Sequence, residues 1–234
     1  MQSPKKKKGF LKIILLLCIL ALVLAGCAGG GRMGRKKGKP EVSPANAGQA
    51  QSAEVEKNGG RKIAYLTFSP PEQVRWVEND DPALRNSGVA EWMVEGSSAE
   101  STPARVMYQK LMPVQDASTL KAQILKPLAG CPDSKVQDLQ LGSKYRDQLG
   151  FQATCSKLGT QDYGLIDYVA IFSDGVANHV MLAEVKTPPS NKVGVLDSKS
   201  AEVQKQAQTS KNFADMLSKV IRSVRVCNEQ ELCI

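Results

Sequence analysis

The sequence predicts an α+β domain in which helices pack on one face of an antiparallel sheet and two disulfides staple the fold. Three observations support this class. Residues 165–186 alternate like a β-hairpin, an apolar stripe with helical spacing follows near residue 213, and four cysteines lie beyond residue 130. Strands followed by helices of this kind are typical of α+β proteins. We expect a single domain over residues 62–234.

Residues 1–26 are predicted to be a signal peptide. Four consecutive lysines, Lys5 to Lys8, precede an apolar run from Phe10 to Leu24 that only Lys12 interrupts. This order matches the positive and hydrophobic regions of a secretory signal. The run is shorter than the roughly 20 apolar residues that a membrane span needs. A single N-terminal anchor helix is the alternative.

The signal ends in Leu24-Ala25-Gly26-Cys27, which resembles the lipobox of bacterial lipoproteins. The resemblance implies cleavage before Cys27, a diacylglyceryl thioether on its sulfur, and acylation of the new amino group with a fatty acid such as palmitate. More than one acyl chain anchors a protein stably, since each buried CH₂ contributes about 0.8 kcal/mol. Ala28 follows the cysteine, which in that family favours the outer membrane. We therefore expect a lipid anchor in the bacterial cell envelope, facing the periplasm, with the inner membrane as the alternative.

Residues 27–61 read as a flexible tether. They contain almost no large apolar side chain, so they cannot bury enough surface to order themselves. The root-mean-square reach of such a segment is about 30 Å. Its basic residues gain about 1 kcal/mol each beside anionic lipid headgroups. We expect either a contact with anionic lipid or a solvated stretch for Arg32, Arg35, Lys36, Lys37 and Lys39.

The overall charge of +8 does not describe the domain. Residues 1–39 hold ten of the 31 basic residues and no acid, which leaves 21 bases against 23 acids in the remainder. A nucleic-acid partner usually requires a basic domain surface. We expect no nucleic-acid partner.

The first half of the domain is predicted to contain two strands and two helices. Residues 62–68 and 90–95 are rich in strand formers, and Asn79 to Pro82 between them form a turn. Trp76 and Trp92 are assigned to packing. A helix over residues 102–111 follows from Thr102-Pro103 at its start and from the spacing of Ala104, Met107, Tyr108 and Leu111. A second helix begins at Ser118 and ends before Pro127.

The second half is predicted to contain strands at 136–141 and 151–156, a hairpin and a final helix. The hairpin joins Leu165–Phe172 to His179–Lys186 through a turn containing Asp174-Gly175. The helix begins between residues 198 and 210. Its core-facing stripe consists of Phe213, Met216, Leu217, Val220, Ile221 and Val224.

The cysteines outside the signal and the lipobox number four. In an exported protein they are most simply two disulfides, with three possible connectivities. We favour Cys131 with Cys155, and Cys227 with Cys233. The first closes a loop of about 25 residues, worth roughly 3 to 4 kcal/mol in the chain-entropy model. A zinc site is disfavoured because there is no C-x-x-C motif and His179 is the single histidine.

Asp167 and the later Glu184-Val185-Lys186 resemble the metal-binding core of the PD-(D/E)xK nucleases. The resemblance implies that Asp167 and Glu184 hold a divalent metal and that Lys186 orients or activates water. A four-residue hairpin loop, residues 174–177, places the two acids directly opposite, and a two-residue loop places them on a diagonal. A three- or five-residue loop puts them on opposite faces. No proline precedes Asp167, and the alternative is that Glu184 and Lys186 lie at the solvated end of an edge strand.

Neither a nucleophile elbow near His179 nor a glycine-rich loop after a strand is present. We therefore expect no cofactor and no enzyme activity. The predicted function is that of a lipid-anchored accessory or adaptor for an envelope protein assembly, contacting its partner through the outer edge of the hairpin. The alternative is a metal-dependent phosphodiesterase or nuclease-like hydrolase that uses Asp167, Glu184 and Lys186.

Overall fold

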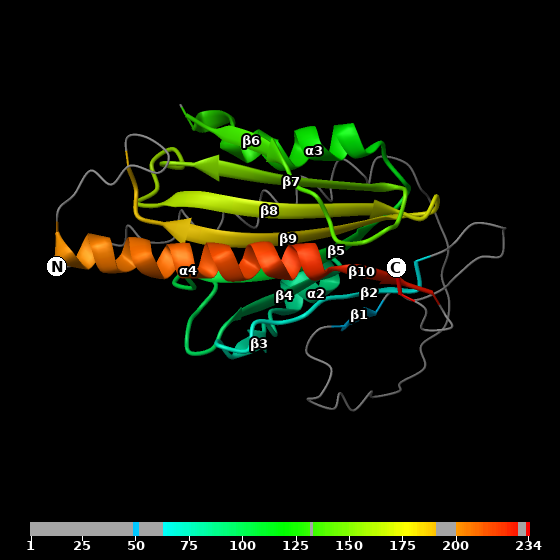
Figure 1. The fold of residues 1–234 in the computed structure, drawn as a ribbon, viewed down its shortest axis with the longest axis horizontal. Helices are drawn as coiled ribbons and strands as arrows, with labels where there is room; N and C mark the ends of the chain where they lie inside the picture. Colours follow the sequence, from blue (N-terminus) through cyan, green and yellow to red (C-terminus); the bar gives the residue numbers. More distant parts are fainter. Residues whose placement is uncertain (1–48, 52–62, 132, 191–199, 229–232) are drawn as a thin grey trace. The chain divides into compact units, whose positions relative to one another are not determined.

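A seven-stranded antiparallel sheet forms the centre of the fold in the computed structural model (Figure 1). The structure describes residues 49–51, 63–131, 133–190, 200–228 and 233–234. The predicted signal peptide, Cys27 and the tether's basic residues lie outside them. In spatial order the strands are β3 (Trp76–Glu78), β4 (Val89–Val94), β5 (Ala104–Leu111), β9 (Asn178–Thr187), β8 (Gly164–Ser173), β7 (Gln148–Cys155) and β6 (Lys135–Asp138).

A smaller sheet contains β1 (Gln49–Gln51), β2 (Tyr65–Thr67) and β10 (Arg225–Cys227), with β2 in the middle. Leu66 of β2 and Val226 of β10 are directly paired and both are buried in the main core. Ile234 forms two backbone hydrogen bonds with Val226, of 3.0 and 3.2 Å. The small sheet is thereby joined to the last described residues of the chain.

Helix α4 (Ala201–Ser223) packs on one face of the main sheet, where it runs along β9 and β8 (Figure 1). Its buried residues include Phe213, Leu217, Val220 and Ile221, as the predicted stripe requires. They share a core with the sheet residues that point to the same side, among them Ala170 and Met181. The position and the buried face of this helix are confirmed.

The opposite face carries α3 (Ala117–Leu125) and the short 3₁₀ helix η2 (Lys126–Gly130). The Asp116 carboxylate caps α3 by accepting the amides of residues 118 and 119, at 3.0 and 3.1 Å. Leu128 packs against Cys155 and Leu165, which alternate with the residues facing α4. The α+β class with an antiparallel sheet is confirmed, but the expectation that the helices share one face is corrected. The short α2 (Pro82–Asn86) begins where a turn was predicted.

Strand β5 overturns the prediction of a helix over residues 102–111. Residues 104–108 are all buried, because β5 lies between β4 and β9 and is covered on both faces. Such a strand has apolar side chains at successive positions, so it also fills the i, i+3 and i+4 positions of a helical stripe. Periodicity alone could not separate the two structures here.

The two disulfides join Cys131 to Cys155 and Cys227 to Cys233, which is the favoured pairing. Their Cα atoms are 5.8 and 4.0 Å apart. The first connects the end of η2 to the end of β7, and the second joins the last residue of β10 to Cys233. None of the helices in the described ranges is long and apolar enough to cross a membrane.

The hairpin of β8 and β9 is confirmed, but it does not lie at an edge of the sheet. Strand β9 pairs with β5 along eight residues, and β8 pairs with β7 along eight. The backbone of the hairpin is therefore fully used within the sheet. Two expectations are corrected: the hairpin does not offer an outer edge to a partner, and Glu184 and Lys186 do not belong to an edge strand.

Candidate functional site

The turn between β8 and β9 has four residues, and it sets the register of the two predicted acids. Ser173 pairs with Asn178, which places Asp167 directly opposite Glu184. The Asp174 carboxylate holds the turn by accepting two later backbone amides within it, at 2.9 and 2.7 Å. The structure therefore brings Asp167 and Glu184 together on one face, as the four-residue loop predicts.

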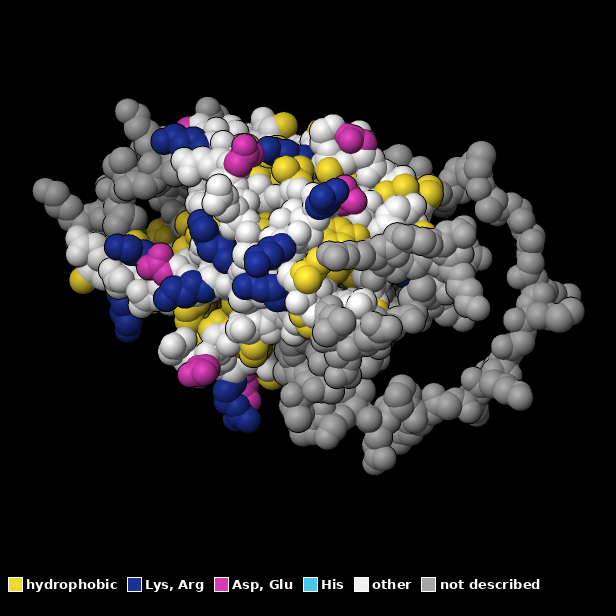
Figure 2. Space-filling model, turned by 45° about the vertical axis from the view of Figure 1, so that its right-hand side comes forward, with side chains coloured by type: hydrophobic (Ala, Val, Ile, Leu, Met, Phe, Trp, Pro, Cys, Tyr) yellow, Lys and Arg dark blue, Asp and Glu magenta, His cyan; other side chains and the backbone are white. Residues whose placement is uncertain are grey.

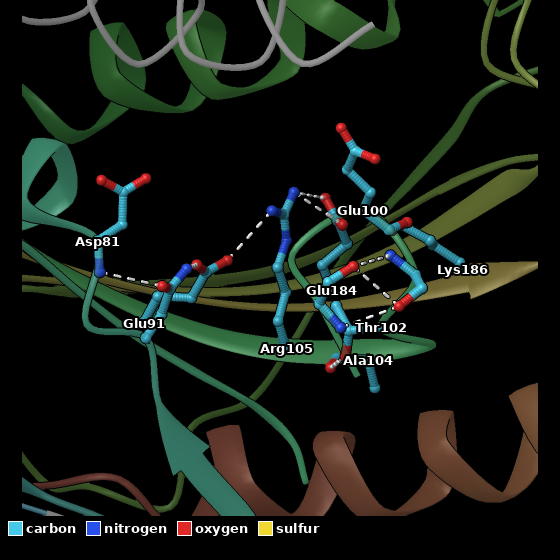
Figure 3. Close-up of polar contacts among 11 residues, drawn as sticks. Asp81, Glu91, Glu100, Thr102, Ala104, Arg105, Glu184 and Lys186 are labelled. Carbon is cyan, nitrogen blue, oxygen red and sulfur yellow. Dashed lines mark hydrogen bonds and ion pairs between the residues drawn. The ribbon is translucent and has the colours of Figure 1, made fainter. Parts of the chain in front are cut away.

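Arg105 on β5 lies next to this pair and was not predicted to be part of the site. It pairs in register with Glu184, and its Nη2 atom is 2.9 and 3.0 Å from the two oxygens of that carboxylate. Its Nη1 atom is 3.2 Å from Oε1 of Glu91 on β4. Figure 3 shows the guanidinium between the two glutamates. We call Glu91, Arg105, Glu184 and Asp167 the charged row.

The charged row is buried. Glu91 is 2% exposed and the other three residues are each 8% exposed. Asn79 donates a short hydrogen bond from its amide to Glu91, which gives that carboxylate a second partner. Burial opposes the charge on Arg105, but Glu184 and Glu91 more than offset this and raise the pKa of the guanidinium. Arg105 is therefore a permanent counter-charge for two buried carboxylates.

Asp167 lacks a comparable partner. Its Oδ1 atom is buried and, like Nε of Arg105, forms no hydrogen bond within the described part of the chain. Burial raises the pKa of Asp167 well above its ordinary value, and the charge of Glu184 raises it further, while Arg105 lowers it. A buried carboxyl group whose surroundings disfavour the ionised form occurs at functional sites as well as in structural networks.

Lys186 lies two residues from Glu184, on the same face of β9, but its ammonium group is directed elsewhere. Nζ donates a 2.7 Å hydrogen bond to the backbone carbonyl of Glu100 and lies 5.4 Å from the centre of the Tyr163 ring. Burial lowers the pKa of Lys186, Glu184 opposes this, and Arg105 adds to it. The lysine thus ties β9 to the loop before β5 (Figure 3).

This arrangement decides what the row can do chemically. Asp167 and Glu184 lie directly opposite each other on neighbouring strands, but the Glu184 carboxylate is already bound to Arg105. A divalent metal at this position has to take Glu184 from the guanidinium. Within the described ranges, no group of three or more His, Cys, Asp or Glu side chains is arranged to hold a metal.

A second buried polar cluster joins the hairpin turn to β5. His179 is fully buried, with Nδ1 2.9 Å from the Tyr108 hydroxyl and Nε2 3.1 Å from Oδ2 of Asp174. Burial lowers the pKa of His179, although Asp174 acts in the opposite direction. Burial also opposes ionisation of Asp174, but two backbone amides and His179 outweigh it and lower the pKa of that carboxyl. We assign a neutral imidazole that donates from Nε2 to Asp174 and accepts from Tyr108.

The prediction of a helix over residues 102–111 hid Arg105, and without Arg105 nothing in the sequence connected Glu91, on a predicted strand, to Glu184. Reading residues 104–111 as a strand would have placed Arg105, Met107 and Gln109 on one face. Strand geometry places Glu91 on the same face of β4 as Val89 and Met93. The missing signal was therefore the strand assignment of residues 104–111, which pairs Arg105 with Glu184.

Comparisons with known proteins identify no family. No protein-family model matches the chain, and no curated protein matches it. Among solved structures, the chain is similar to a point mutant of a protein described as Mog1, with 15% identity and a TM-score of 0.42 over 76% of this chain and 97% of the other. It is also similar to the Saccharomyces cerevisiae Ran-binding protein Mog1p, with 14% identity and a TM-score of 0.40 over 71% and 93% of the two chains. At these identities the likeness concerns the fold alone.

Proposed function

We propose that this protein is a lipid-anchored lipoprotein of the bacterial cell envelope that acts as a non-enzymatic accessory or adaptor for an envelope protein assembly. The observation that carries the non-enzymatic part is the pairing of Arg105 with both Glu91 and Glu184. The lipobox resemblance at Cys27 supports the location and the anchor.

The ion pairs of Arg105 give the charged row a structural role. Side-chain exposures of 10% for Arg105, 2% for Glu91 and 11% for Glu184 show that these charges have exchanged water for one another. Removing one member of such a network leaves an uncompensated buried charge, which is strongly destabilising. Residues under this constraint are suited to holding β4, β5 and β9 together. The contact with a partner is then made by the outer surface of the domain.

The edges of the main sheet offer such a surface. Strand β6 lies at one edge and all four of its residues are exposed, while β3 lies at the other. Edge strands present unpaired backbone groups that can recruit a further strand. A tether made of the part of residues 27–61 that precedes β1 would let the domain leave the bilayer and reach a partner, with its basic residues available to anionic lipid.

Metabolic labelling with palmitate and crosslinking in intact envelopes test this proposal. The wild-type chain is expected to incorporate palmitate, to fractionate with the outer membrane, and to crosslink reproducibly to a specific envelope protein. Cys27→Ser should abolish labelling and membrane retention, whereas Cys18→Ser, in the predicted signal, should change neither. A labelled protein that forms no specific crosslink would contradict the adaptor function, and an unlabelled wild type would contradict the anchor.

A second candidate is a metal-dependent phosphodiesterase or nuclease-like hydrolase. The observation that favours it is the direct pairing of Asp167 with Glu184, together with the unpartnered Oδ1 atom of Asp167. In this proposal the two carboxylates hold Mg²⁺ or Mn²⁺, and Lys186 leaves the carbonyl of Glu100 to orient water.

Hydrolysis assays separate the two candidates. The purified protein is incubated with Mg²⁺ or Mn²⁺ and with DNA or bis-p-nitrophenyl phosphate. Activity that is lost in Asp167→Ala and Glu184→Ala, but kept in the exposed control Asp138→Ala, would establish the hydrolase. Folded protein without hydrolysis at saturating metal would eliminate it.

A further inference from the structure

An apolar hollow lies beside edge strand β3, on the face of the sheet that α4 covers further along. It is shallow and open to solvent, with a cavity volume of about 10 Å³, and two tryptophans form part of its wall. The Phe68 and Trp92 rings meet edge to face, with centroids 5.9 Å apart. We call this feature the edge hollow, and its lining consists of Phe68, Pro70, Pro71, Trp76, Trp92 and Val106.

The edge hollow contains an unused hydrogen-bond donor. Nε1 of Trp76 is buried and has no acceptor within the described residues. An unsatisfied buried donor destabilises the structure that holds it, and buried indole N–H groups usually have a partner. A carbonyl oxygen of a docked chain would supply one.

Strand β3 also has an open backbone edge. Its inner side is bonded to β4, since Glu95 donates to the carbonyl of Arg75 and Asn79 donates to the carbonyl of Glu91. In an antiparallel pair these groups alternate, so the backbone groups of Trp76 and Glu78 face away from β4. An extended segment can add to this edge, and its alternate side chains would then face the hollow.

The charge around the edge hollow is acidic. Glu72 follows Pro71, and Glu78 lies on the same face as Trp76, directly across from Trp92. Both glutamates are exposed, and neither forms an ion pair with another residue that the structure describes. The basic residues of this region already form ion pairs, Arg75 with Glu95 and Arg85 with Asp80.

This acidic charge is local. Residues 63–100 contain seven acids and two bases, whereas residues 200–228 contain five bases and two acids. Lys and Arg side chains are prominent on the face shown in Figure 2. Complementary charge steers partners and excludes those of the same sign. A segment that docks at the edge hollow should therefore be basic.

We infer that the edge hollow is the docking site for an extended, basic segment of a partner protein, which adds to β3 as a strand. One apolar side chain packs over the mouth of the hollow against the tryptophan rings, a backbone carbonyl accepts from Nε1 of Trp76, and flanking Lys or Arg residues lie near Glu72 and Glu78. The inference rests on the proposed adaptor function for the existence of a partner, and it names the chemistry of that partner.

Peptide binding to the full chain in detergent tests the inference. The probe is a ten-residue peptide with an alternating Leu-Thr core and two lysines at each end. The control peptide has the same core, with glutamates in place of the lysines. Binding is read from tryptophan fluorescence. The lysine peptide is expected to bind at least tenfold more tightly than the glutamate peptide, with an affinity that falls as salt rises.

Variants locate the binding. Trp76→Phe keeps a ring and removes the donor, and should weaken binding about 3- to 10-fold, as expected for one neutral hydrogen bond. The double variant Glu72→Gln with Glu78→Gln should remove most of the preference for lysine. Asp138→Asn on the opposite edge strand is the matched control and should leave binding unchanged.

Several results would overturn the inference. Two of them are equal binding of both peptides, and binding that Trp76→Phe and the double variant leave unchanged. The other two are tighter binding of a peptide that corresponds to residues 32–41 of this chain, and self-association of the protein that the double variant abolishes. The last two would assign the hollow to the chain itself or to a second copy. Crosslinking in envelopes is a separate measurement. A partner that crosslinks equally well to these variants refutes the docking site alone, whereas peptide binding without any envelope partner refutes the adaptor function alone.

Discussion

Replacing Arg105 by methionine should destabilise the fold by about 3–5 kcal/mol at pH 8, the usual cost of removing one member of a buried ion network. The structure places this variant in the buried class. The guanidinium nitrogens lie 2.9 and 3.2 Å from the Glu184 and Glu91 oxygens, and all three side chains are at most 11% exposed. Solvent screening is therefore weak, and the change removes a large share of a typical stability of about 5–15 kcal/mol.

Urea unfolding of the oxidised protein, followed by tryptophan fluorescence, measures this loss. Arg75→Met is the matched control, because the ion pair of Arg75 with Glu95 is exposed and should contribute less than about 1 kcal/mol. Adding Glu91→Gln and Glu184→Gln should recover most of the stability.

The reasoning would be refuted by a loss below about 1 kcal/mol at pH 8, or by a loss of the same size when both glutamates are already glutamines. In each case the buried charges would be compensated by something other than Arg105.

Three further predictions concern other buried groups. Asp167→Asn should stabilise the protein, and urea unfolding should show that its advantage over the wild type grows as pH rises above about 4. The pKa of Asp167 is raised in the folded state, so the carboxyl ionises at a lower pH in the unfolded chain, and the wild type loses stability as pH rises through that range. The pKa of His179 is lowered, so its pH dependence runs the other way: the neutral imidazole contributes stability above about pH 6.5, and this stability declines as pH falls. His179→Gln should therefore flatten the stability profile between pH 6.5 and 5. The double variant Cys131→Ser with Cys155→Ser should lose about 3 kcal/mol under oxidising conditions, whereas in reducing buffer, which opens both disulfides, the variant and the wild type should have similar stability.

The parts of the fold that the sequence predicts are those with local signals. Asp174-Gly175 between two apolar runs specifies the hairpin, and the apolar stripe around Leu217 specifies α4. The disulfide pairing follows from the closeness of the cysteines along the chain. Each of these signals is contained in fewer than about 30 residues.

The remainder depends on contacts that are distant along the chain. Whether residues 104–111 form a helix or a strand is decided by the backbones of β4 and β9, which bond to this segment from both sides. The role of Arg105 follows from that placement, since its partner Glu184 is 79 residues away. The edge hollow likewise combines β3 and β4 with the segment after β2, so no single stretch of sequence announces it.

The central position of the hairpin has a consequence for the order in which the sheet is built. Four residues join β8 to β9, whereas β5 reaches β9 across the whole segment between Leu111 and Asn178. Short loops close at a lower entropic cost, and long-range pairings form later. Glu184 can therefore enter the hairpin before Arg105 arrives to neutralise it, so completion of the charged row would mark the docking of β5. Arg105 variants should then act mainly on the unfolding rate and leave the formation of the hairpin almost unchanged.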